Sequence, residues 1–206
     1  MTDWSQDPER LERNILRAIA EHFEPRDLLP MVERLARIAP AGSPPWAFAH
    51  CKLAELLLDT HPWRAATVAR LVTRELPEND VAWGQLGLAL TVLGHYRSAA
   101  RAYRQALALA PEDPWYAHNL GHLLDVPLNS PLEAVYWLRI AFRTEPHVEI
   151  AASLAQALGH IGRAKEGLRV LRRGLRGESG SAEHQALEAW LVERAPSAPR
   201  RGRPGP

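Results

Sequence analysis

Apolar residues recur along this chain at every third or fourth position, a spacing that places them on one face of an α-helix. The clearest case is residues 80–113, where Gly94 separates two such stretches and Pro111 closes the second. Glycine accepts the left-handed conformation that ends many helices, and proline cannot continue a helix. The pattern therefore predicts two amphipathic helices, packed face to face, over residues 80–113.

The same arrangement repeats with a period close to 34 residues. Leu86, Leu120 and Leu154 are 34 residues apart, and a proline closes each unit. Small residues follow the same period on both helices of a pair: Gly87, Gly121 and Ala155 on the first, and Ala99, Ala134 and Gly167 on the second. Because small side chains let two helices approach closely, we expect these residues to face each other within each pair.

This spacing resembles the tetratricopeptide repeat, a helix–turn–helix unit of 34 residues. Residues 80–113 carry most of the family pattern, namely Trp83, Leu86, Gly87, Leu90, Tyr96, Ala99, Tyr103, Ala106 and Pro111. Residues 114–147 follow it too, but Ala117 stands at the first large position and the inter-helix loop is one residue longer. The resemblance implies an all-α, right-handed superhelical solenoid of about four to five repeats and about 11 helices.

The expected units are residues 8–40, 46–79, 80–113, 114–147 and 148–177, which form a single domain over residues 1–194. A lone amphipathic helix over residues 182–194 follows them, and such a helix can cover the open end of a repeat array. Residues 195–206 are basic and rich in proline, so we expect disorder there.

Local signals refine two of these helices. Ser130 is expected to cap a helix that has Pro131 at its first position. A helix over about residues 28–39 contains Pro30, which is tolerable if it lies in the first turn.

Composition narrows the class of protein. The formal net charge of +1 over 206 residues argues against binding that depends mainly on nucleic-acid electrostatics. Cys51 is the only cysteine, which excludes an intramolecular disulfide and fits a reducing compartment. No apolar run approaches the roughly 18 residues of a membrane helix, and no signal-peptide core is present. We therefore expect a cytoplasmic protein without membrane insertion, and its Ala, Arg, Leu and Pro content suggests a bacterial source.

Catalytic signatures are absent from the sequence. It contains no phosphate-binding loop, dinucleotide fingerprint or nucleophile elbow. Cys51 lies beside an apolar run, which indicates packing rather than reactivity. We expect no enzyme activity and no cofactor.

In proteins of the resembled family, the first helices of the repeats line a concave groove that binds ligands. The residues of those helices that are not needed for packing are therefore candidates for partner binding. The most informative strip combines an aromatic ring with hydrogen-bonding side chains on one helix face: Trp115, His118, Asn119, His122 and Asp125. Further candidates are Gln85, Glu149 and Gln156, with Phe48, Lys52, Glu55, Asp59, Leu88, Val92 and Ser153 at other groove positions. A solvated helix face without a ligand is the alternative interpretation.

Two further clusters have side chains that could bind a metal ion or an anionic partner. His118 and His122 have a helical spacing that suits zinc, with Asp125 or Glu149 as a third ligand, but no HExxH pattern or cysteine pair supports a metal site. The last repeat carries a secondary basic face made of Arg169, Arg172, Arg173 and Arg176. This face is either solvated or binds an acidic partner or nucleic acid.

These patterns predict a non-catalytic scaffold or adaptor that binds a peptide or helix of a partner protein in the concave groove. One alternative is a structural subunit that self-associates, or that docks through its outer face or repeat ends. Another is a secretion-type chaperone, although such members of the resembled family are usually acidic. Nucleic acid is the least expected partner, because the net charge is close to zero.

Overall fold

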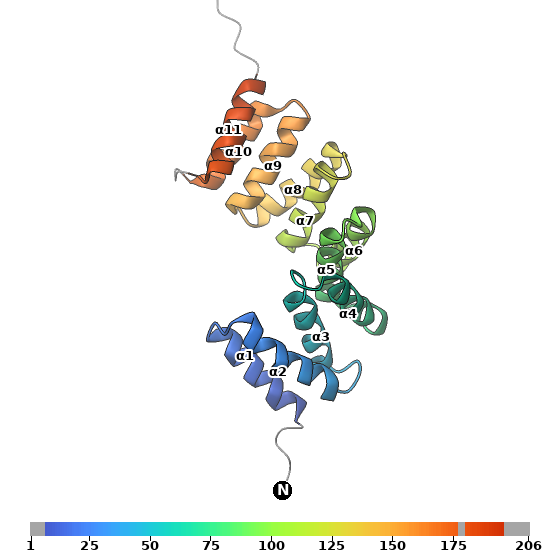
Figure 1. Cartoon of the computed structure of the whole chain (residues 1–206). Helices are drawn as coiled ribbons and strands as arrows, with labels where there is room; N and C mark the ends of the chain where they lie inside the picture. The colour runs from blue at the N-terminus through green and yellow to red at the C-terminus, as the bar shows by residue number, and fades with distance from the viewer. Residues whose placement is uncertain (1–6, 177–179, 196–206) are drawn as a thin grey trace, which may run out of the picture. The chain divides into compact units, whose positions relative to one another are not determined.

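The computed structural model describes residues 7–176 and 180–195, and these residues form eleven α-helices and no strand (Figure 1). The helices are α1 (Pro8–Ala20), α2 (Pro25–Ile38), α3 (Pro44–Leu56), α4 (Pro62–Glu75), α5 (Asp80–Val92), α6 (Tyr96–Leu109), α7 (Pro114–Asp125), α8 (Pro131–Thr144), α9 (Val148–His160), α10 (Ala164–Leu175) and α11 (Ala182–Arg194). The predicted all-α fold of about 11 helices is confirmed.

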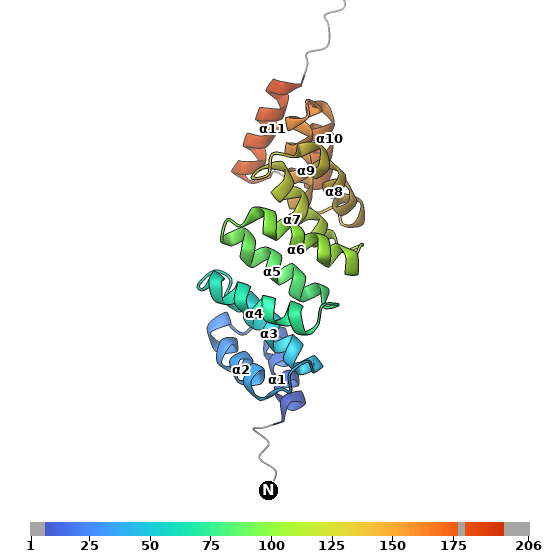
Figure 2. The same ribbon diagram turned by 90° about the vertical axis from the view of Figure 1, so that its right-hand side faces the viewer.

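Consecutive helices pack in pairs, from α1 with α2 to α9 with α10, and we call the members of each pair its first and second helix. The chain divides into two compact units, Met1–Pro111 with α1–α6 and Glu112–Pro206 with α7–α11. Figure 2 shows α3 to α6 following one another in the first unit, and α7 to α10 in the second. The expectation of a single domain over residues 1–194 stays a prediction, and residues 196–206 of the expected disordered tail lie outside the described residues.

Small residues allow the close contact within each pair. A Cβ atom added to Gly121 on α7 would lie 2.5 Å from Cγ of Leu138 on α8. A Cβ atom added to Gly167 on α10 would lie 2.7 Å from the carbonyl oxygen of Ala155 on α9. Both distances are far below van der Waals contact, so no side chain fits between the helices at these points. The prediction that the small residues face the partner helix is confirmed.

The last helix, α11, covers apolar surface on α9 and α10. Leu191 is fully buried in a cluster with Ala155, Ala164 and Leu171. The ring of Trp190 lies directly against the backbone of Gly159, where a Cβ atom would collide with it. The predicted C-terminal capping helix is therefore present, and a glycine on α9 makes room for its largest side chain.

The start of α1 and the end of α5 each depend on one residue. The Asp7 carboxylate accepts hydrogen bonds from the N–H groups of Glu9 and Arg10, at 3.0 and 3.3 Å, and so caps α1. Gly94 has a φ of 75°, which confirms the left-handed residue predicted at the end of α5.

Two local predictions are wrong. The Ser130 hydroxyl donates to the carbonyl of Leu128 at 3.3 Å and makes no capping bond to α8. Helix α2 begins at Pro25, so Pro30 lies in its interior rather than in its first turn. Pro25 is itself suited to the first helical position, which is why α2 starts one turn earlier than expected.

We predict that Gly121→Ala lowers the free energy of unfolding by about 1–2 kcal/mol, although alanine favours helix formation over glycine. The added methyl group meets the buried Leu138, which has no free space to move into. In a Leu138→Ala background the same change should be neutral or stabilising. Urea denaturation of the four proteins measures the coupling, and an equal cost in both backgrounds would contradict the packing argument.

Candidate functional site

The start of α7 holds a large aromatic ring at the protein surface. The Asp113 carboxylate accepts hydrogen bonds from the N–H groups of Trp115 and Tyr116, both at 2.9 Å, and so determines where α7 begins. Trp115 is 37% exposed. Because the cap fixes the first turn of α7, the indole ring projects from a defined position on the surface.

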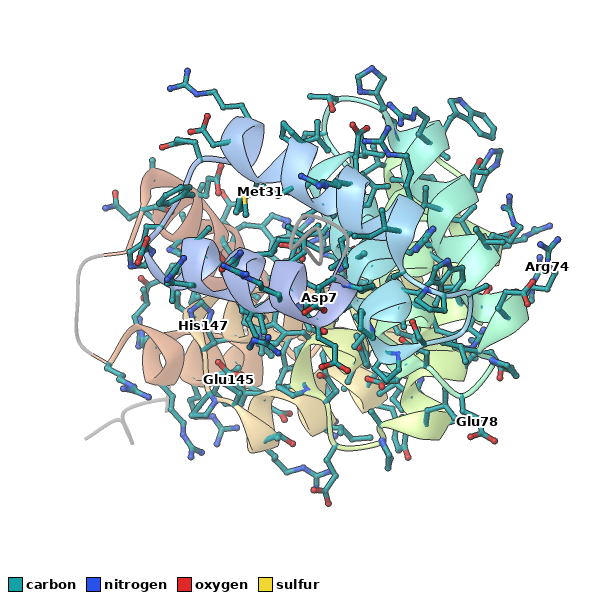
Figure 3. All side chains as sticks on the ribbon, turned by 90° about the horizontal axis from the view of Figure 1, so that it is seen from below. Asp7, Met31, Arg74, Glu78, Glu145 and His147 are labelled. Atoms are coloured by element: carbon teal, nitrogen blue, oxygen red, sulfur yellow. The ribbon has the colours of Figure 1, made fainter. Side chains whose placement is uncertain are left out.

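Two imidazole rings support the indole of Trp115. The ring of His118 meets it edge-on with centroids 5.7 Å apart, and the ring of His147 does so at 5.5 Å. His147 is the cap residue of α9, and its N–H donates to the Glu145 carbonyl at 2.8 Å (both residues are labelled in Figure 3). Trp115 is therefore held by residues of α7 and by the start of α9, which makes it a rigid surface feature.

His118 joins the first helices α7 and α9. Its Nε2 atom lies 3.0 Å from the Ser153 hydroxyl oxygen, while its Nδ1 atom is buried without a hydrogen bond of good geometry. Burial lowers the pKa of His118 to about 4, the nearby His122 and His147 add to this, and Glu149 and Asn119 oppose it. The imidazole is therefore neutral at physiological pH.

The remaining strip residues differ in exposure. His122 is exposed, and its ring centroid is 6.4 Å from that of His118. Asn119 is half-buried on α7, and Glu149 is exposed in the first turn of α9. The structure thus brings together Trp115, His118, Asn119, His122, Glu149 and Ser153 along α7 and α9. We call these six residues the α7–α9 strip.

Asp125 does not belong to the exposed strip, contrary to the sequence prediction. It is only 5% exposed, and its Oδ1 atom lies 2.8 Å from Nδ1 of His160. The amide of Gln156, a second predicted partner-binding residue, donates to its Oδ2 atom at 3.5 Å. Asp125 is therefore buried, and Gln156, which is half-buried, and His160 join it to α9. The partner-binding role of Gln156 stays a prediction.

The contact extends to the capping helix through residues that the sequence analysis missed. The ring of His160 meets Trp190 edge-on at 5.4 Å, and the Arg194 guanidinium lies 4.3 Å from the Trp190 ring. The spacing of these residues in the sequence could have predicted the contact. His160 follows Asp125 by 35 residues, and Ser153 follows His118 by the same interval. That interval is close to one repeat, so polar residues spaced by it lie on neighbouring first helices.

Gln85 belongs to the first unit, whereas the α7–α9 strip belongs to the second. It lines a cavity of about 430 Å³ between the first helices α3 and α5, together with Phe48, Lys52 and Glu55. Its Oε1 atom is buried without a hydrogen-bond partner in the part of the chain that the structure describes. Lys52 and Glu55 form an ion pair at 2.7 Å on the rim.

Cys51 also lines this cavity. Burial raises the pKa of its thiol to about 11, and the nearby Asp80 adds to the shift. The thiol is therefore protonated at physiological pH and is a poor nucleophile, which agrees with a packing role.

Comparisons with known proteins agree with this geometry. The sequence model of the tetratricopeptide repeat family matches residues 81–113. The crystal structure of TTC0263, a tetratricopeptide repeat protein of Thermus thermophilus, is 18% identical; the match covers 91% of this chain and all of that one, with a TM-score of 0.69. The chain thus contains a tetratricopeptide repeat at residues 81–113 and has the tetratricopeptide repeat fold.

Further matches extend the comparison. The structure of pilF of Pseudomonas aeruginosa has a TM-score of 0.76 at 17% identity, over 90% of this chain and 83% of that one. YrrB, described as a tetratricopeptide repeat protein with an unusual peptide-binding site, has a TM-score of 0.63 at 20% identity, over 71% and 76% of the two chains. Protein FlbA of Caulobacter vibrioides is 35% identical over 111 residues, which are 53% of this chain and 18% of FlbA. The chain thus matches less than a fifth of that relative.

The tetratricopeptide repeat fold supports protein–protein interaction in general and is typically non-catalytic. Within the described ranges 7–176 and 180–195, no three His, Cys, Asp or Glu side chains are grouped so that they could hold a metal ion. No helix in those ranges is long and apolar enough to cross a membrane.

The four predicted residues of the secondary basic face have different surroundings in the structure. Arg172 pairs with Glu188 of α11 at 2.8 Å, which helps to hold the capping helix. Arg169 donates to the Lys165 carbonyl of its own helix at 3.4 Å. Arg176 ends α10 in the left-handed conformation, and Arg173 lies 5.7 Å from the ring of Phe142 on α8. All four arginines are exposed, and their binding of an acidic partner stays a prediction.

We predict that His118 makes stability depend on pH. Its folded pKa of about 4 is below the unfolded value of about 6.5, so the unfolded chain takes up a proton first as the pH falls. The stabilising contribution is complete above about pH 6.5 and is lost as the pH falls toward 4. Between about pH 7.5 and 4.5, the wild type should lose about 1–3 kcal/mol more of its unfolding free energy than His118→Gln does. Equal losses in urea titrations would refute this assignment.

We also predict that Asp125 is a structural residue. Asp125→Ala should lower the free energy of unfolding by about 1–3 kcal/mol, because it leaves Gln156 and His160 without their acceptor, and Asp125→Asn should cost less. The exposed Asp59, replaced by alanine, is the matched control and should change stability by about 0.5 kcal/mol or less. Equal effects of Asp125→Ala and Asp59→Ala in urea denaturation would count against this role.

Proposed function

We propose that this protein is a non-catalytic scaffold that binds a peptide segment of a partner protein on the α7–α9 strip. The observation that carries the proposal is the placement of Trp115, an exposed indole held between two histidine rings. An aromatic side chain that is already ordered loses little conformational entropy on binding, and such residues dominate binding energy at protein interfaces.

The rest of the strip supplies polar groups suited to a peptide backbone. Asn119 has both an amide donor and an acceptor, and the exposed His122 lies one helical turn after His118. The description of YrrB as a protein with a peptide-binding site supports the same general use of this fold, at the level of analogy.

The neutral state of His118 fits the proposed ligand. A neutral imidazole beside Trp115 does not repel a positively charged peptide and does not select an acidic one. Glu149 is the acidic residue of the strip and is exposed, so the sign of the local charge favours a neutral or weakly basic segment. A cytoplasmic, bacterial setting is part of the same proposal, and it rests on the single buried thiol and on the composition.

We predict that Trp115→Ala releases the partner proteins that the tagged full-length chain retains from its native lysate, with apparent Kd raised about 30-fold or more for each purified partner. Trp63→Ala is a matched control, because Trp63 is 64% exposed on the second helix α4 and meets a histidine, His95, edge-on at 5.6 Å. The control should retain every partner.

Circular dichroism must first show that both variants are folded. If Trp115→Ala retains every partner, the strip is not the binding surface. If Trp63→Ala releases the partners instead, the protein binds through an outer face. Light scattering on that variant then distinguishes self-association from binding of another protein.

A further inference from the structure

A second surface in the unit Glu112–Pro206 has features of a binding groove. It is a cavity of about 560 Å³ between the second helices α8 and α10, and Leu154 of α9 and Ile161 also line it. It differs from the α7–α9 strip, which is built from first helices. We call it the α8–α10 groove.

The wall of the groove on α8 is apolar and exposed. Leu132 is 75% exposed and Tyr136 is 59% exposed, and both line the cavity. These residues are one helical turn apart and therefore lie on the same face of α8. Phe142 also lines the cavity but is buried, so the apolar surface continues into the protein. Capping helix α11 packs against α9 and α10 at Gly159 and Gly167, and none of its residues lines the cavity.

The charged residues that line the groove are strongly biased to one sign. Four are arginines, Arg139, Arg143, Arg163 and Arg173, and one is an acid, Glu166. Glu166 pairs with Arg139 at 2.7 Å and also with Arg163. Within the described ranges of the chain, Arg143 and Arg173 have no carboxylate partner, and the Arg173 guanidinium lies over the Phe142 ring. Two exposed guanidinium groups beside an apolar wall thus lack a counter-charge.

We propose that the α8–α10 groove binds an acidic amphipathic helix of a partner protein. Large apolar side chains of that helix would cover Leu132 and Tyr136, and its flanking carboxylates would pair with Arg143 and Arg173. Arginine suits this role because its planar guanidinium binds a carboxylate through two hydrogen bonds and also packs on aromatic rings.

Two other classes of partner fit the groove less well. Nucleic acid would pair its phosphates with the arginines but would leave the exposed wall of Leu132 and Tyr136 uncovered. An anionic membrane favours apolar side chains that protrude from a flat or convex surface, whereas this site is hollowed to about 560 Å³. A helix laid in a groove covers both the apolar wall and the charges.

The test uses the full-length chain and two fluorescein-labelled peptides of about 15 residues, long enough to form a helix when bound. Both have leucine on one helix face, and one has glutamate and the other lysine on the opposite face. In fluorescence anisotropy, the glutamate peptide should bind at least about 10-fold more tightly than the lysine peptide, and its affinity should fall as salt is added.

Variants locate the binding surface. Arg143→Glu/Arg173→Glu should weaken the glutamate peptide about 10-fold or more, and Tyr136→Ala should weaken it by a similar factor. Arg169→Glu is the matched control, because it makes the same charge change on α10 at an exposed residue that does not line the groove. The control and Trp115→Ala should both remain within about 2-fold of the wild type.

Three results would overturn the proposal. The first is equal affinity for the two peptides, or no binding of either at millimolar concentration. The second is a loss with Arg169→Glu as large as that with the double reversal, which would indicate unspecific attraction. The third is binding of poly-uridine RNA, or of phosphatidylserine-containing vesicles, that is tighter than binding of the glutamate peptide and that the double reversal abolishes. Circular dichroism of each variant ensures that a loss of binding is not a loss of folding.

Discussion

The close approach of two helices through small residues is the constraint on which the rest of this structure depends. At Gly121 and Gly167 there is no space for even one methyl group, since the facing atoms lie 2.5 and 2.7 Å from where it would be. Larger residues would separate the helices of a pair and shift every later first helix. The positions of the surface side chains are therefore a consequence of packing that lies beneath them.

The regular stacking of first helices creates polar contacts at an interval of 35 residues. His118 reaches Ser153 in this way, and Asp125 reaches His160. The two contacts have different consequences, because Asp125 is buried while His118 lies under the exposed Trp115. One contact therefore joins a buried carboxylate to the neighbouring first helix, and the other orders the surface around Trp115.

First and second helices present different chemistry. The α7–α9 strip combines an indole with hydrogen-bonding groups and one acid, Glu149. The α8–α10 groove combines an apolar wall with two guanidinium groups that pair with no carboxylate among the described residues. A scaffold with two such surfaces could hold two segments of different charge at once. The division follows from the repeat, in which each helix has one face for packing and one face free to vary.

The sequence by itself determined the helix pairs, because the small residues and the 34-residue period are local and regular signals. It also located Trp115, His118, Asn119 and His122 on one helix face. Only the tertiary structure decided that Asp125 is buried and contacts Gln156 and His160, since both partners come from α9, about one repeat later in the chain. In the same way, only the tertiary structure decided that Arg172 pairs with Glu188 of α11 while Arg173 lies near Phe142 of α8, because these partners come from other helices.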